Sequence, residues 1–145
     1  MELLKLYDIA DKEDIEVVDF RLRSASALSE MDTDLSCYIA LDKRKLTTTA
    51  EEKTALAHEL GHCMTGSFYN RYSPFDSRDR HERRANKKAA YIVIPLDELI
   101  DACRSPWNRV CDLAEHFEVT EDFMLYAMGL YQDELFRAFA DVREM

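Results

Sequence analysis

The pattern of apolar and polar positions predicts a short helix and a small sheet at the start of the chain. Apolar residues fall near one side of a helix over residues 3–10. The segments 15–20 (IEVVDF) and 37–42 (CYIALD) are rich in β-branched and aromatic residues, so each predicts a strand. The polar segment 24–36 between them has no strong periodicity, and it predicts either a third strand or a connecting loop.

A long helix is predicted next. Thr48 and Thr49 lie at capping-box spacing before two glutamates, so one of these hydroxyls is expected to accept a hydrogen bond from the first exposed amides of the helix. Gly66 is expected to end this helix, because glycine readily adopts the left-handed conformation of a helix terminus. Turn-forming residues then predict a loop over residues 67–79.

Helical patterns fill the second half of the chain. Apolar residues recur at helical spacing from about residue 79 until Pro95, which is expected to end that helix. A short helix is predicted over residues 96–100. Pro106 suits the first turn of another helix, and one last helix is expected to begin at about Glu121. These elements, with only three Gly and three Pro in 145 residues, indicate an α+β fold and disfavour a turn-dense all-β protein.

Charge and hydrophobicity exclude several classes of function. The formal net charge of −10 repels nucleic-acid phosphates and anionic membranes, so no direct nucleic-acid or membrane partner is expected. The longest apolar run, Ala89–Leu96, is far shorter than the ~20 residues that span a bilayer. The first residues lack the layout of a signal peptide, so we expect a cytoplasmic protein. Four cysteines without a CxxC pair are expected to be buried free thiols: Cys37, Cys63, Cys103 and Cys111.

One motif on the predicted helix carries chemistry. Residues 58–62 read HELGH, in which His58 and His62 are four residues apart. On a helix this spacing places the two imidazoles about 40° apart and one turn along the axis, so both can bind one metal ion. Glu59 points to a neighbouring side, where it can accept a proton from water at the metal. The motif therefore predicts a zinc site for hydrolysis, with Glu59 as the catalytic base.

The third ligand is less directly indicated. A metzincin would have histidine six residues after His62, but Phe68 stands there, so that class is excluded. The remaining candidates are Asp76, Asp79, His81, Glu82 and His116. Glu82 is the expected ligand because it begins the next predicted helix in phase with Asn86, which can hydrogen-bond to a ligand. His81 is the rival ligand, or a group that steadies the oxyanion, a role for which Tyr69 and Tyr72 are also candidates.

The two halves of this pattern resemble the ImmA/IrrE family of metallopeptidases. HELGH at 58–62 is followed by ERRAN at 82–86, by Ala89 and Ala90, and by an apolar run that closes at Pro95. The resemblance covers about residues 35–95. It implies that His58, His62 and Glu82 bind Zn²⁺ and that Glu59 is the general base.

A second resemblance, over residues 113–120, is to half of a helix-turn-helix. A DNA-reading helix needs basic or amide side chains at its start, whereas this one begins Thr120-Glu121-Asp122. Glu118 also replaces the usual glycine of the turn. We therefore expect this segment to pack against the rest of the chain and not to read DNA.

Together these observations predict an intracellular zinc endopeptidase of narrow specificity. We expect a single domain over residues 1–145, with a small antiparallel or mixed sheet and the metal-site core in 1–95 and a helical extension in 96–145. The family resemblance implies that the substrate is a transcriptional repressor, and a surface of net charge −10 suits a basic partner. The alternatives are a metal-containing antirepressor or binding module that captures the repressor without cutting it, and a degenerate scaffold that no longer binds metal.

Overall fold

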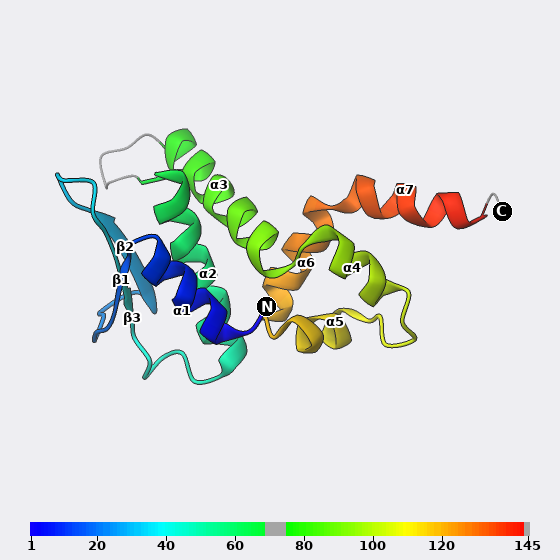
Figure 1. The fold of residues 1–145 in the computed structure, drawn as a ribbon, viewed down its shortest axis with the longest axis horizontal. Coiled ribbons are helices and arrows are strands. Elements are labelled where there is room, and N and C mark those ends of the chain that lie inside the picture. The colour runs from blue at the N-terminus through cyan, green and yellow to red at the C-terminus, as the bar shows by residue number, and fades with distance from the viewer. Residues whose placement is uncertain (69–74, 144–145) are drawn as a thin grey trace.

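The computed structural model describes residues 1–68 and 75–143. Its elements confirm an α+β fold, with the strands near the N-terminus and helices through the rest of the chain (Figure 1). In chain order the elements are α1 (Leu3–Lys12), β1 (Glu16–Asp19), β2 (Ala27–Met31), β3 (Cys37–Leu41), α2 (Thr49–Thr65), α3 (Phe75–Val93), α4 (Leu96–Cys103), α5 (Val110–Phe117), α6 (Glu121–Leu130) and α7 (Gln132–Arg143).

The three strands form a mixed sheet in the order β1-β3-β2. β1 runs parallel to β3, and β2 runs antiparallel to it. The segment 24–36 therefore contains a strand, β2, which lies at an edge of this sheet. Alternate residues of β3, Cys37, Ile39 and Leu41, are buried, as expected for a strand with one face against helices. α1 and α2 cover that face (Figure 1).

α2 has the predicted ends. The Thr48 hydroxyl accepts a hydrogen bond from the backbone N–H of Glu51 at 3.1 Å. Gly66 ends the helix with φ of 65°, in the left-handed region. Leu56, Ala57 and Leu60 on its inner face are fully buried, so α2 lies in the centre of the core.

α3 packs along α2 and begins earlier than predicted. It starts at Phe75, so the last part of the predicted loop over 67–79 is helical and that prediction is wrong there. Residues 69–74, which include Tyr69, Tyr72 and Pro74, lie outside the described residues. The helix ends before Pro95, as predicted. α3 therefore spans the whole length of the ERRAN pattern and its small-residue pair.

Two predictions for the C-terminal helices are wrong. α5 begins at Val110, not around Pro106, because the Asp112 carboxylate accepts hydrogen bonds from both the backbone and the guanidinium of Arg109 and so caps the helix there. The single helix predicted from about Glu121 is two helices that break at Tyr131. The ring of Tyr131 is buried and its hydroxyl donates to the carbonyl of Ile94, an anchor that no local pattern encodes.

The C-terminal helices share one continuous core with the rest of the described chain. α7 packs against this core through Leu135 near its start, and the helix then projects away (Figure 1). Lys53 of α2 is buried, and its ammonium group donates to the carbonyl of Phe117 at the end of α5. Burial lowers the pKa of this ammonium group. The backbone N–H of Thr120 donates to the hydroxyl of Thr54, also on α2. Among the described residues, no helix combines the length and apolar character needed to cross a membrane.

Candidate metal centre

The site begins with a close approach of two helices. Gly61 of α2 lies directly against the backbone of Ala85 in α3, and an added Cβ on Gly61 would be 2.2 Å from the Ala85 carbonyl oxygen. Real side chains do not approach backbone atoms so closely, so only glycine fits at this position. Because Glu82 and Asn86 flank Ala85 on the same helix, the contact carries both of them toward His58 and His62.

His58, His62 and Glu82 converge at this crossing. The Nε2 atoms of the two histidines are 3.1 Å apart. Oε2 of Glu82 lies 3.0 Å from Nε2 of His58, and Oε1 lies 3.3 Å from Nε2 of His62. One ligand atom from each of the three residues falls within 4.8 Å of the others. The structure thus brings together the three side chains that the sequence analysis selected.

The other nitrogen of each imidazole is held by a hydrogen bond. Nδ1 of His58 contacts the side-chain oxygen of Asn86 at 2.7 Å, which confirms the hydrogen bond expected of Asn86. Nδ1 of His62 contacts the backbone carbonyl of Ser67. A carbonyl oxygen only accepts, so each Nδ1 carries a proton and donates it. In the neutral form of each ring, Nε2 carries the lone pair, and it faces the Glu82 carboxylate.

This arrangement fits a divalent cation. In neutral imidazoles with protonated Nδ1, the two Nε2 atoms and the carboxylate are all acceptors, and three acceptors repel unless a cation lies among them. Tetrahedral ligands at 2.0–2.1 Å from zinc are separated by about 3.3 Å. The separations of 3.0–3.3 Å between these atoms are close to that value. The donor set could therefore hold a metal ion with little movement.

Glu59 lies beside this group without belonging to it. It is 7% exposed and lines the same hollow as His58, His62 and Glu82. The wall opposite comes from the start of β2, including Ala27 and Ser29. His58 and Glu59 also line a second hollow, which extends toward Phe123 of α6. Glu59 therefore lies where two adjoining surface hollows meet.

The segment that leads into β2 is fixed by a charged cluster. The Lys45 ammonium donates to the carbonyls of Leu22, Arg23 and Ala25 at 2.8–3.2 Å. Asp42, 1% exposed, accepts from the backbone N–H of Leu22 at 3.0 Å. Hydrogen bonds from the Arg44 guanidinium to Asp42 lower the pKa of this carboxyl to about 2. The cluster thus holds a wall of both hollows in place.

The remaining sequence candidates lie elsewhere. Asp79 pairs with Arg83 at 3.1 Å, and both side chains are largely exposed. His116 is exposed on α5 and lines a different hollow. His81, half-buried on α3, is not part of the three-residue group. The side chain of Asp76 is not among those described, and Tyr69 and Tyr72 fall outside the described residues.

Comparison with known families agrees with this geometry. The family model described as Peptidase_M78, IrrE N-terminal-like domain, matches residues 10–128, most of the chain. The chain belongs to this family. Peptidase_M78 is a metallopeptidase family, and the group of His58, His62 and Glu82 fits a protein of this kind. The comparison with curated proteins gave no match.

Two features of this Peptidase_M78 domain were missed or mistaken from the sequence. The expectation of four buried free thiols is wrong, because Cys37 and Cys63 form a disulfide and Cys111 is exposed. The pair is 26 residues apart and comes together only because α2 packs on β3. The partner of His62, the carbonyl of Ser67, was also missed, since a backbone acceptor leaves no signal in residue type.

Proposed function

We propose that this chain is a zinc-dependent endopeptidase that cuts a specific protein substrate. The observation that carries the proposal is the convergence of His58, His62 and Glu82 in a hollow that Glu59 also lines. Catalytic zinc sites typically have three protein ligands and keep another position open. Imidazole ligands also favour zinc over Mg²⁺ and Ca²⁺, which prefer oxygen.

The place of Glu59 in this hollow supports a role as the general base. Zinc bound here would supply Lewis acidity, which polarises a peptide carbonyl and makes water a stronger acid. Glu59 accepts a proton on its carboxylate from the attacking water and returns it to the leaving amine nitrogen. Asn86 and Ser67 hold the rings of His58 and His62, so these ligands need little rearrangement during the reaction.

The edge of β2 offers a way to bind a peptide in an extended conformation. The backbone N–H of Asp42, after β3, donates to the carbonyl of Ser26, before β2, at 2.8 Å. Along an antiparallel pair, residues whose backbone groups bond to the partner strand alternate with residues whose backbone groups point away from it. In this register the backbone groups of Ala27 and Ser29 point away from β3, to the open edge of the sheet. Both residues also line the hollow with Glu59. A substrate strand that pairs with them would pass directly over the three ligands.

We further propose a basic helix-turn-helix transcriptional repressor as the substrate. The ImmA/IrrE resemblance supports this class of partner. The net charge of −10 favours encounter with a positively charged protein, because complementary charges raise association rates. An extended linker of such a repressor, and not its folded DNA-binding unit, is the segment that suits a strand-edge site.

A cleavage assay with a matched pair of variants tests the proposal. The Zn²⁺-loaded protein is incubated with the helix-turn-helix repressor encoded nearest to its gene, and the products are identified by mass spectrometry. We expect two fragments with the unmodified chain and none with Glu59→Gln, which keeps the size of the side chain but removes the base. Glu115→Gln, a change of an exposed glutamate on α5, should cleave like the unmodified chain.

Two results would overturn this function. The first is that Glu59→Gln and the unmodified chain inhibit DNA binding by the repressor equally. The protein would then act as a non-proteolytic antirepressor. The second concerns the metal. If the unmodified chain still cuts after a chelator has removed bound metal, the three-residue group is not the source of the activity.

A further inference from the structure

The disulfide joins the sheet to the helix that carries the metal-site residues. Cys37 is the first residue of β3, and Cys63 follows His62 directly in the last turn of α2, with a Cα–Cα distance of 5.9 Å. The covalent loop between the two cysteines contains the whole segment 58–62. The bond therefore encloses three of the four site residues, with Glu82 alone outside the loop.

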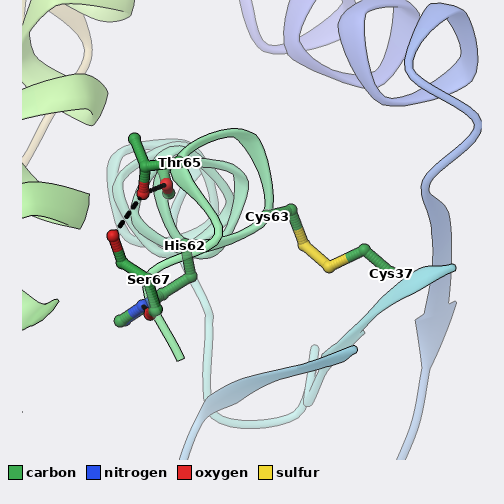
Figure 2. Close-up of a disulfide and its surroundings, with 6 residues drawn as sticks. Cys37, His62, Cys63, Thr65 and Ser67 are labelled. Atoms are coloured by element: carbon green, nitrogen blue, oxygen red, sulfur yellow. Dashed lines mark hydrogen bonds between the residues drawn. A yellow bond between two sulfur atoms is a disulfide. The ribbon is translucent and has the colours of Figure 1, made fainter. Parts of the chain in front are cut away.

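The same turn of α2 is held from another side by polar contacts. Figure 2 shows Cys63 directed toward β3 and His62 directed away from it, toward Ser67. The Thr65 hydroxyl donates to the Gly61 carbonyl at 2.7 Å and lies 2.6 Å from the Ser67 hydroxyl. The last turn of α2 is thus held by the disulfide on the side of the sheet and by hydrogen bonds on the side of residues 65–67.

We propose that Cys37 and Cys63 are a reversible oxidation site whose closure orders the metal-binding end of α2. In the disulfide form the turn that carries His62 is tied to β3. In the dithiol form that covalent tie is absent, while the packing of α2 and the contacts to residues 65–67 remain. The inference depends on the proposed function only where zinc affinity is concerned.

Solvent reaches the disulfide through a surface hollow. Cys37 and Cys63 both line it, together with the acidic residues Glu13, Asp14 and Asp34. Three carboxylates repel anionic thiols such as glutathione, whereas small neutral reagents are not excluded. We therefore infer that a neutral peroxide closes the bond and a neutral dithiol opens it.

The chemistry balances with these reagents. On oxidation by hydrogen peroxide, the O–O bond breaks, both thiols lose their protons, the S–S bond forms and two water molecules leave. The peroxide is reduced and the two cysteines are oxidised. On reduction by dithiothreitol, thiol–disulfide exchange breaks the S–S bond, both cysteines regain protons, and the reagent becomes its cyclic disulfide.

The redox state and the metal site are thermodynamically linked. If the disulfide form binds Zn²⁺ more tightly by a given factor, then bound Zn²⁺ favours the disulfide form by the same factor. Couplings of this kind are about fivefold or more. We expect the dithiol form to bind zinc at least about fivefold more weakly, because His62 then sits on a less ordered turn.

The test uses the double variant Cys103→Ser/Cys111→Ser. Cys37 and Cys63 are then the remaining cysteines, and both stay in place. The protein is treated with hydrogen peroxide or with dithiothreitol, and differential alkylation followed by peptide mapping reports the state of Cys37 and Cys63. Amide hydrogen exchange then compares the two forms without metal. We expect residues 62–68 to exchange at least about fivefold faster in the dithiol form, with α6 unchanged as an internal reference.

Several outcomes would overturn the proposal. Alkylation of both cysteines after peroxide treatment shows that the bond does not form in the folded chain. Equal exchange of residues 62–68 in the two forms shows that it orders nothing. Equal zinc affinity of the disulfide and dithiol forms, measured by competition with a chromophoric chelator, shows that the disulfide does not affect metal binding. If neither form binds zinc, the proposed function fails, while the exchange comparison still decides the oxidation site.

Discussion

The backbone of Gly61 touches the backbone of Ala85, and this contact sets the distance between the two helices that carry the candidate metal centre. Glu82 lies one turn before Ala85 and Asn86 directly after it. The contact thus explains why a glycine belongs between the two histidines and an alanine between the glutamate and the asparagine. Small residues at the crossing thus shape the candidate metal centre, although neither can bind an ion.

Gly61→Ala should separate the two helices. The added methyl group would lie 2.2 Å from the Ala85 carbonyl oxygen, so the backbone of α2 or α3 has to move. We expect a loss of about 1–3 kcal/mol in the free energy of unfolding, the usual cost of overpacking a core. Zinc affinity should fall as well, because Glu82 moves away from His58 and His62. Urea denaturation and zinc titration measure the two effects.

Gly129→Ala is the matched control for that change. Gly129 is also helical, but nothing lies within 4 Å of an added Cβ there. Alanine is favoured over glycine in a helix by about 0.5–1 kcal/mol, so this variant should be slightly more stable than the unmodified chain. Equal effects of the two substitutions would contradict the role assigned to the Gly61–Ala85 contact.

Asn86→Ala should weaken metal binding without unfolding the chain. The variant removes the oxygen that accepts the Nδ1 proton of His58 at 2.7 Å, so the ring loses its fixed orientation. Loss of such a partner typically costs about 10–100-fold in metal affinity. Competition with a chromophoric chelator measures this change. Asn108→Ala, an exposed asparagine after α4, should bind zinc like the unmodified chain, and a similar loss there would point to a nonspecific effect.

Local patterns in the sequence were sufficient for much of the fold. Thr48 and Gly66 mark the ends of α2 because capping depends on residue type at fixed positions. The candidate ligands His58 and His62 follow from helical spacing alone. Spacing alone does not select Glu82, because that choice also depends on which face of the next helix meets α2. In the structure its carboxylate lies 3.0 Å from His58.

What local patterns could not predict depends on contacts between distant segments. The Cys37–Cys63 bond exists because α2 packs on β3. The break between α6 and α7 coincides with the buried ring of Tyr131, whose hydroxyl bonds to Ile94. The start of α5 is displaced from Pro106 by the Arg109–Asp112 cap, a side-chain geometry that outweighs the preference of proline for a first turn.

Ser29→Pro tests the binding of substrate along β2. The backbone N–H of Ser29 is directed to the open edge, so proline removes a donor that the sheet itself does not use. We expect about a tenfold loss of cleavage, the value of roughly one hydrogen bond, with zinc affinity unchanged. Ser29→Ala keeps the N–H group and should cleave normally. A Ser29→Pro variant with full activity would place the substrate elsewhere.

Asp42→Asn tests the cluster that holds the wall of the hollows. Hydrogen bonds from Arg44 lower the pKa of Asp42 from 3.8 to about 2, so the ionised carboxyl is favoured in the folded state. Its contribution to stability is present above the unfolded pKa and is lost as the pH falls through about 2. Acid denaturation should therefore show a smaller fall in stability for Asp42→Asn than for the unmodified chain.

The control for acid denaturation is Asp8→Asn, a change of an exposed aspartate in the middle of α1. This variant should lose stability in acid as the unmodified chain does. Identical acid profiles for Asp42→Asn and Asp8→Asn would mean that the Arg44 contact does not contribute to folding.

Lys53 links the two halves of this chain. Its side chain, on the helix of the candidate metal centre, is buried, and its ammonium group donates to the carbonyl of Phe117. A fragment cut after Pro95 would lose that acceptor and leave a lysine facing the exposed remnant of the core. Chimeras that exchange C-terminal helices between relatives should therefore fold only when the grafted segment presents a carbonyl to this lysine.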